Sequence, residues 1–279
     1  MTKFSAADVK RLRELTAAGM MDCKKALEEA DGDFDKAVEV LRVKGAKDVG
    51  KREARTASNG LVTAHLDGNS SGVLLELNCE TDFVAKTPAF QELAADVAAH
   101  VASAGPKDVD DLLEQASGTG GSKTVKQVLD EANVTMGEKI EVRRFARFED
   151  GYVAAYLHKS SPDLPPTVGV LVELDRENPQ VAKDVAQHIA AMNPQFGSPD
   201  EVPAETVENE RWVAEQMARD EGKPEQAIGR IVEGRVSAYY KDFTLLEQAY
   251  VKDPKKSIKQ VLDAAGVTVT RFARFKVGS

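Results

Sequence analysis

Residues 72–77, GVLLEL, recur almost unchanged at residues 169–174 as GVLVEL, and this recurrence decides the fold. Four further segments are repeated in the same order in both halves of the chain. They are GLVTAHL (60–66) with GYVAAYL (151–157), DVAAHVA (96–102) with DVAQHIA (184–190), KQVLD (126–130) with 259–263, and RFARF (144–148) with 271–275. Five matches in one order indicate an internal duplication.

Each copy has the pattern strand, strand, helix, helix, strand. The strand segments alternate polar and apolar residues or are rich in Val and Leu, whereas the helical segments carry apolar residues three and four positions apart. The sequence therefore predicts an α+β fold. Its core would consist of two duplicated subdomains, each with a small antiparallel sheet covered by helices.

The N-terminal segment is predicted to be helical. Ser5 and Asp8 form a capping-box pattern at the start of the first helix, and Asp22 is expected to cap the second. A third helix follows, and then a basic polar connector that we also expect to be helical. The adjacent Met20 and Met21 either pack in the core of this module or form an adaptable contact surface.

The repeat also locates the boundaries of the parts. We predict an N-terminal three-helix module with its connector at 1–55, a first core subdomain at 56–149 and a second at 150–279. Between the two repeated helical segments there are 68 residues in the second copy (190 to 259) and 23 in the first (102 to 126). Apolar residues at helical spacing in this excess predict a helical hairpin at about 200–250, an arm for docking or assembly.

The segment NCETDFVAKT, residues 78–87, marks where the first copy differs from the second. Between the second strand and the next repeated helix there are 18 residues in the first copy and 9 in the second. The fold does not need the additional nine residues, so they are a candidate for function. Phe83 either packs on the following helix or anchors an interface, and the sequence leaves both alternatives open.

Other chemistries find little support in the sequence. Cys79 has no His close by to act as its base, so a thiol enzyme is a weak alternative. Glu80 and Asp82 alone provide too few ligands for a metal. The segment SGTGGSKT, 117–124, has no Gly directly before its Lys and no preceding strand, and it reads as a linker, not as a phosphate loop. We expect no enzyme activity, no metal and no cofactor.

Bulk composition narrows the class of partner. The net charge of −9 repels nucleic-acid backbones, so a direct nucleic-acid partner is not expected. Two cysteines give no disulfide framework and fit a reducing cytoplasm. The N-terminal residues show no apolar core of the kind that a signal peptide has, and no apolar run is long enough for a membrane span, so no membrane association is expected.

Two stretches carry a resemblance to a known family. LRELTAAGMMDCKKAL (12–27) and ELNCETDFVAK (76–86) closely resemble the signature segments of bacterial elongation factor Ts, the guanine-nucleotide exchange factor for elongation factor Tu. The resemblance covers nearly the whole chain. It implies a ubiquitin-associated-like N-terminal module, a cytoplasmic bacterial protein, and binding to elongation factor Tu both with GDP and without nucleotide. It also implies that the complex could assemble as a dimer.

The resemblance further implies a mechanism and three groups of partner-binding residues. The chain would promote exchange of GDP for GTP by disturbing the Mg²⁺ and phosphate site of its partner. The implied residues are Thr81, Asp82, Phe83 and Val84 in the Mg²⁺-displacing segment, Arg13, Met20 and Met21 in the N-terminal module, and Val168, Gly169 and His188 in the core. A non-catalytic adaptor is the main alternative, and the thiol enzyme using Cys79 is the other.

Overall fold

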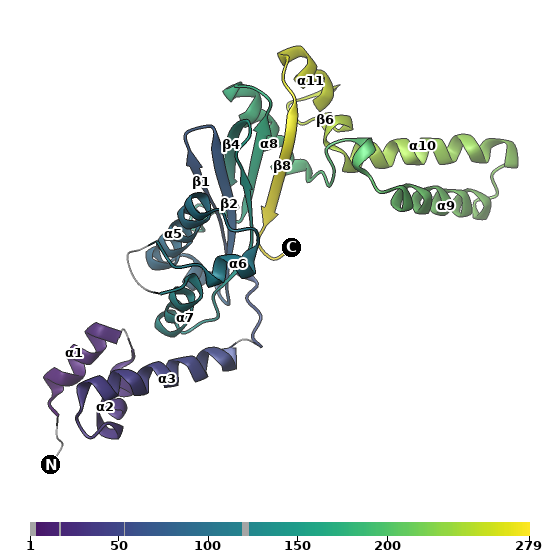
Figure 1. The fold of residues 1–279 in the computed structure, drawn as a ribbon. Coiled ribbons are helices and arrows are strands. Elements are labelled where there is room, and N and C mark those ends of the chain that lie inside the picture. The colour runs from purple at the N-terminus through teal and green to yellow at the C-terminus, as the bar shows by residue number, and fades with distance from the viewer. Residues whose placement is uncertain (1–3, 17, 53, 119–122) are drawn as a thin grey trace.

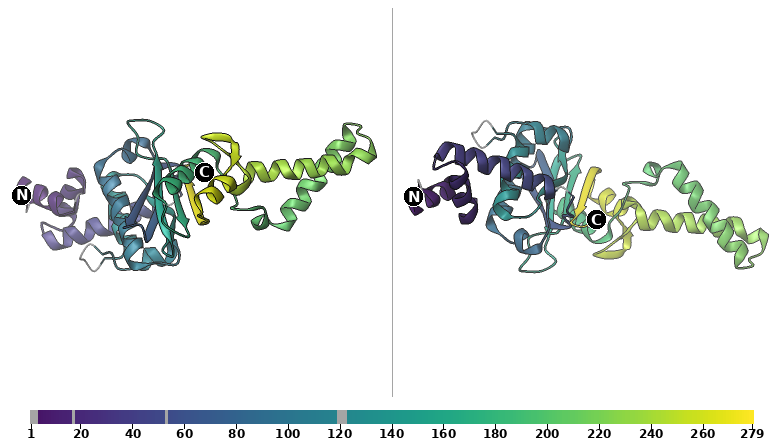
Figure 2. Two further views of the ribbon diagram at one scale, coloured as in Figure 1. Left: turned by 90° about the horizontal axis from the view of Figure 1, so that it is seen from above. Right: turned by 90° about the horizontal axis from the view of Figure 1, so that it is seen from below.

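The chain forms an elongated molecule with helical modules at the two ends of a central core (Figures 1 and 2). The structure is a computed structural model and describes residues 4–16, 18–52, 54–118 and 123–279. The N-terminal module contains α1 (Ala6–Thr16), α2 (Met20–Glu29) and α3 (Phe34–Arg52). At the other end, α9 (Ala204–Asp220) and α10 (Glu225–Phe243) form a hairpin that projects away from the core.

The core contains the predicted duplication as two three-stranded antiparallel sheets, with strand orders β1-β2-β3 and β4-β5-β8. The first copy comprises β1 (Asn59–Asp67), β2 (Ser71–Cys79), α4 (Asp82–Ala85), α5 (Pro88–Ala104), α6 (Val109–Glu114), α7 (Val125–Met136) and β3 (Glu141–Phe148). The second comprises β4 (Tyr152–His158), β5 (Val168–Leu174), α8 (Pro179–Met192), η1 (Pro199–Glu201), the α9–α10 hairpin, η2 (Leu245–Glu247), β6 (Ala249–Tyr250), β7 (Asp253–Ser257), α11 (Ile258–Ala265) and β8 (Val269–Lys276). The predicted α+β class with small antiparallel sheets is confirmed.

The two sheets pack face to face, and helices cover their outer surfaces (Figure 1). Strand β2 is buried on both sides, with Leu75 among the residues that face α5 and Leu74 among those that face the other sheet. The glycine of each repeated motif permits this approach. A Cβ atom at Gly169 would lie 2.5 Å from Cγ1 of Val62, and one at Gly72 would lie 2.8 Å from a valine methyl of β4. Glycine here reflects close sheet packing.

Reciprocal charged contacts also join the sheets. Arg144 Nε donates to the buried carboxylate of Glu76 at 2.7 Å, and its guanidinium lies 4.7 Å from the ring centre of Phe275 on the other sheet. The second copy repeats both contacts in the opposite direction, as Arg271–Glu173 (2.9 Å) and Arg271–Phe148 (4.7 Å). In each copy, an arginine therefore lies over a phenylalanine ring of the other sheet, and these cation–π contacts join the two sheets.

The N-terminal module confirms one predicted cap and corrects another. The capping box is present, because the amide of Ser5 donates to the carboxylate of Asp8 at 2.8 Å. The predicted cap at Asp22 is wrong: Gly19 occupies the N-cap of α2, and Asp22 forms an ion pair with Lys44 from α3. Helix α3 continues into the connector that we expected to follow it, as far as Arg52, and it contacts α7.

The structure also reveals a sixth repeated segment that the sequence reading missed. LLEQA occurs at 112–116 and at 245–249, and its spacing to KQVLD is the same in both copies. The whole excess of the second copy therefore lies between α8 and η2, where α9 and α10 pack through buried aliphatic residues and an Arg211–Glu233 ion pair. The predicted boundaries at residues 55 and 149 fall between α3 and β1 and between β3 and β4. That the segments 1–55, 56–149 and 150–279 act as separate functional units remains a prediction.

Candidate partner-binding site

The segment between β2 and α5 forms one turn of helix, α4, a helical form that the sequence analysis did not predict. The Thr81 side chain accepts a hydrogen bond from the amide of Val84 at 3.4 Å and so occupies the N-cap position. Thr87 donates its hydroxyl hydrogen to the Val84 carbonyl at 2.8 Å and caps the N-terminus of α5. Both ends of the turn are therefore fixed by threonine side chains.

A distant carboxylate braces the start of this turn. Glu138, between α7 and β3, accepts hydrogen bonds from the amides of Glu80 (3.1 Å) and Thr81 (3.0 Å) and from the Thr81 hydroxyl (2.5 Å). Glu80 in turn accepts a hydrogen bond from the amide of Lys139 at 2.7 Å. Hydrogen bonds to a charged acceptor are stronger than neutral ones, so this pair of acids fixes α4 to the α7–β3 connection. Sequence reasoning missed Glu138, because no local pattern marks a contact 57 residues away.

The braced turn points two of its side chains outward. Ala85 is buried, and Val84 packs against the first core. Phe83 is 77% exposed, so it does not pack on α5 as one of the two alternatives had it. Asp82 lies beside it and accepts a hydrogen bond from Lys86 Nζ at 2.8 Å, and the same ammonium group lies 5.7 Å from the centre of the Phe83 ring.

The electrostatics of the turn keep Asp82 ionised. Its hydrogen bond with Lys86 lowers the pKa of the Asp82 carboxyl below its ordinary value. The tip of α4 therefore presents a carboxylate next to an uncovered aromatic ring. An exposed aromatic residue on a fixed backbone is the kind of residue that anchors protein interfaces.

Cys79 has a different environment. Its side chain is fully buried, and Sγ donates to the Thr81 carbonyl at 3.1 Å. Burial, together with the negative charge of Glu138, raises the pKa of the Cys79 thiol to about 12. Since the thiolate is the nucleophilic form, this environment disfavours the thiol-enzyme alternative. Within the ranges that the structure describes, no three His, Cys, Asp or Glu residues come together as a possible metal site.

The N-terminal module exposes the residues that the resemblance indicated. Arg13 is exposed in the last turn of α1, and Met20 and Met21 are 45% and 61% exposed at the start of α2. Neither methionine belongs to the core of the module, so core packing does not account for them, and a contact with a partner stays a prediction. Flexible, polarizable methionine side chains suit a contact surface that adapts to its partner.

The three core positions lie deeper. Val168 is half-buried at the start of β5, and Gly169 is buried between the sheets. His188 is fully buried: its Nε2 lies 2.9 Å from Oε1 of Gln248, and its Nδ1 accepts from the amide of Val251 at 3.2 Å. Burial lowers the pKa of His188 below its ordinary value. A role toward a partner stays a prediction for these residues, and for Gly169 and His188 such a role would be indirect.

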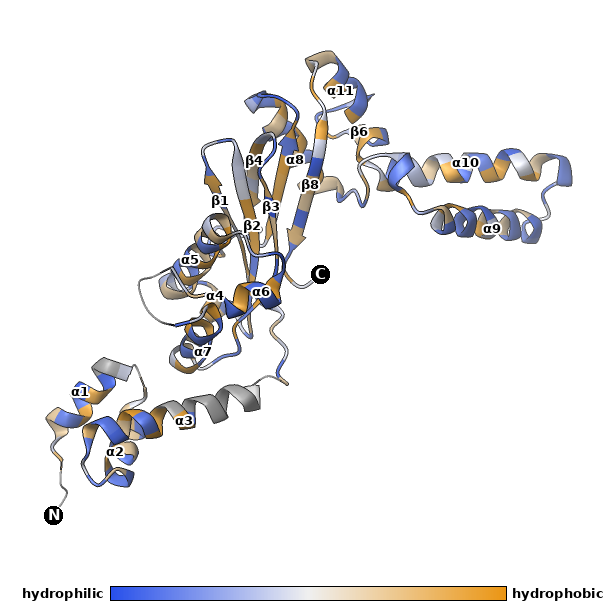
Figure 3. Cartoon of the chain, viewed as in Figure 1, coloured by the Kyte–Doolittle hydropathy of each residue, from blue (hydrophilic) through white to orange (hydrophobic). Residues whose placement is uncertain are grey.

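These features define a class of protein. Helical modules lie on an α+β core, and hydrophilic and hydrophobic residues are mixed along α9 and α10 (Figure 3). Several apolar side chains are exposed, and the most exposed of them, Phe83, is held on a braced helical turn. This is the construction of a factor that works by contact with other macromolecules. No helix among the described residues combines the length and apolar character that a membrane span requires.

Comparison with known proteins identifies the family. Residues 80–279 match the family model described as Elongation factor TS. The chain is 64% identical over 278 residues to Elongation factor Ts of Thermobifida fusca (strain YX), across all of this chain and 99% of that protein. It is 60% identical over 279 residues to Elongation factor Ts of Streptomyces ramocissimus, across the full length of both. The chain belongs to the elongation factor Ts family and has the family's role in translation elongation.

Proposed function

We propose that the chain binds elongation factor Tu, with GDP or without nucleotide, and promotes release of GDP and its exchange for GTP. The observation that carries this proposal is the 77% exposure of Phe83 on a turn that Glu138 braces from a distance. The chain would perform no bond chemistry and need no cofactor. It would act in the bacterial cytoplasm.

The mechanism rests on the geometry that Mg²⁺ demands. Mg²⁺ bound with GDP requires near-ideal octahedral coordination, so small displacements of its ligands weaken it sharply. Phe83 would wedge between side chains of the partner, and the Asp82 carboxylate would disturb the charge balance beside the ion. Because α4 is already ordered, little of the binding free energy would be lost in fixing the wedge.

Coupling between the two ligands must be reciprocal. If the chain weakens the binding of GDP to its partner, GDP weakens the binding of the chain by the same factor. A loss of ~2–4 kcal/mol from the GDP complex corresponds to roughly 30–1000-fold weaker affinity. Exchange would be accelerated in both directions, and the ratio of free GTP to GDP would set the net direction.

Docking would be divided among the parts of the chain. Arg13, Met20 and Met21 would contact the partner from the N-terminal module, and the core would contribute through the Val168 region. The coiled-coil hairpin of α9 and α10 would assist docking or a dimeric assembly of the complex. This division rests on the exposed residues of the module and on the projection of the hairpin from the core.

The direct test is the rate at which a fluorescent GDP analogue leaves purified elongation factor Tu. Excess unlabelled GDP is added with and without the chain, and release should accelerate with the concentration of the chain. An adaptor would bind elongation factor Tu and leave the rate unchanged, a result that would refute the exchange proposal.

A further inference from the structure

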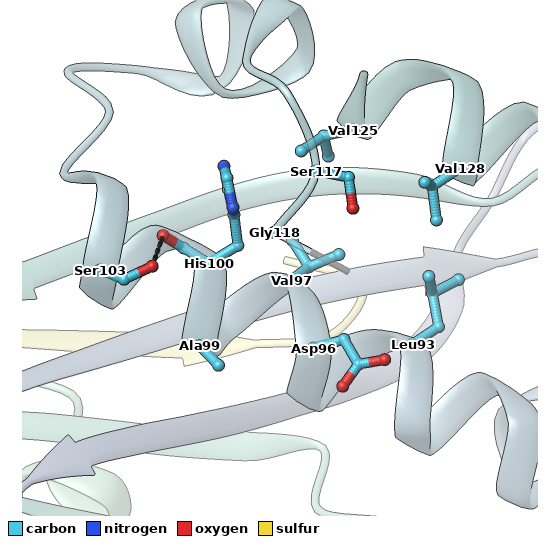
Figure 4. Close-up of a pocket in the computed structure, with 10 residues that line it drawn as sticks. All are labelled: Leu93, Asp96, Val97, Ala99, His100, Ser103, Ser117, Gly118, Val125 and Val128. Carbon is cyan, nitrogen blue, oxygen red and sulfur yellow. Dashed lines mark hydrogen bonds between the residues drawn. The ribbon is translucent and has the colours of Figure 1, made fainter. Parts of the chain in front are cut away.

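The first copy of the core contains a cavity of about 380 Å³ between α5 and α7 (Figure 4). Most of its wall is apolar, and Asp96 and His100 add polar groups. Its wall also includes Leu93, Val97, Ala99, Ser117, Val125 and Val128. Its volume lies in the range of protein sites that take up small molecules or single side chains.

The second copy shows what occupies the equivalent space. Because LLEQA and KQVLD have the same spacing in both copies, Ser117 corresponds to Tyr250 and Gly118 to Val251. Tyr250 is only 8% exposed and packs in the core of the second copy, against residues of α8 and α11. The cavity of the first copy therefore lies at the position that the phenol ring of Tyr250 fills in the second copy.

The polar end of the site is also duplicated. In the second copy, Lys252 Nζ lies 2.6 Å from Oδ1 of Asp184. Burial, together with the negative charge of the nearby Asp184, raises the pKa of Tyr250. The corresponding residue of the first copy is Asp96, since both begin the repeated DVA motif. Within the described part of the chain, Asp96 makes no hydrogen bond or ion pair. The first copy thus has the cavity and the Asp96 carboxylate, but its sequence has no counterpart of Tyr250, which fills the cavity in the second copy, or of Lys252, which pairs with the carboxylate there.

We propose that this cavity is a docking site for a tyrosine side chain of a partner protein, with a neighbouring basic residue of that protein pairing with Asp96. A buried aromatic side chain removes about 150–250 Å² of surface from water, and a tyrosine hydroxyl needs a polar partner when buried. The apolar wall satisfies the first requirement and Asp96 the second. The chain's net charge of −9 also favours a basic segment as the partner.

The probe is a capped peptide with the sequence AYVKD, residues 249–253, because this segment carries the tyrosine that fills the equivalent space in the second copy. Methyl NMR of the full-length protein should show shifts confined to the methyl groups that line the cavity, those of Leu93, Val97, Ala99, Val125 and Val128. Replacing the tyrosine of the peptide by serine should weaken binding about thirtyfold, as truncation of an interface anchor does. Absence of methyl shifts at millimolar peptide, or equal binding of both peptides, would overturn the proposal.

Variants of the protein provide the matched test. Ser117→Tyr should fill the cavity from within, as in the second copy, raise the Tm and abolish peptide binding. Ala99→Gln introduces the smaller obstruction found at the equivalent position and should weaken binding if the first variant does not fold. Asp96→Asn should remove the preference for lysine over glutamate at the fourth peptide position. Unchanged binding in all three variants would place the peptide elsewhere and refute the site.

Discussion

Replacing Glu138 by alanine tests whether α4 is held in place by a carboxylate distant in sequence. The change removes the acceptor of three hydrogen bonds, from the amides of Glu80 and Thr81 and from the Thr81 hydroxyl. Nothing else in the contacts of α4 is altered, because the caps at Thr81 and Thr87 are formed within the turn. The expected result is local opening of the turn with the core intact.

The magnitude follows from those three bonds. A hydrogen bond to a charged group contributes roughly 1.5–3 kcal/mol when water is excluded. Glu138 is only half-buried, and water can replace part of what is lost, so the total should be about 2 kcal/mol. That corresponds to roughly thirtyfold more frequent opening.

Amide hydrogen exchange of Thr81 measures this opening directly. We expect about thirtyfold faster exchange in Glu138→Ala and an intermediate rate in Glu138→Gln, whose amide keeps one acceptor oxygen. Glu141→Ala is the matched control, because that carboxylate pairs with Lys139 at 2.9 Å. Exchange of Thr81 within twofold of wild type in Glu138→Ala would refute the brace.

Three further predictions address the core and the rival function. Burial lowers the pKa of His188, so the unfolded chain binds its proton more readily; stability should be full above about pH 6.5 and fall as the pH drops below it. Tm measured from pH 8 to pH 5 should therefore decline less in His188→Gln than in wild type or the exposed control His158→Asn. Gly169→Ala should cost ~1–3 kcal/mol in urea unfolding, because its Cβ would lie 2.5 Å from a valine methyl, whereas Gly229→Ala, in open space on α10, should stabilise. Cys79→Ser should retain GDP-release activity, while loss of activity at unchanged Tm would favour the thiol enzyme.

The duplicated sheets were predictable because burial leaves a strong periodic pattern. Each GVL(L/V)EL strand is buried on both faces and is bounded by polar or glycine residues in both copies. The stacking of one sheet on the other was not predicted. The glycines at 72 and 169 read only as strand starts, and their requirement for close approach is visible only when the facing residues are in place.

The candidate site was located by the sequence, but its construction was not. The difference between the copies drew attention to residues 78–87, and Asp82 and Phe83 do project from this segment. The helical form of the turn was missed because its N-cap, Thr81, follows the strand directly and starts only four helical residues. The wrong cap at Asp22 has a related cause: Gly19 adopts extended backbone there and starts the helix three residues earlier.

The central claim is that Phe83 acts on the partner while contributing little to the fold, and one measurement separates these effects. Release of fluorescent GDP from elongation factor Tu is compared for wild type, Phe83→Ala and the exposed control Val251→Ala, with the Tm of each variant. Because Phe83 is 77% exposed, its truncation should change stability by less than about 0.5 kcal/mol. The account predicts that Phe83→Ala slows stimulated release roughly thirtyfold at unchanged Tm, as loss of an interface anchor would. Release as fast as that of wild type and of Val251→Ala would contradict it.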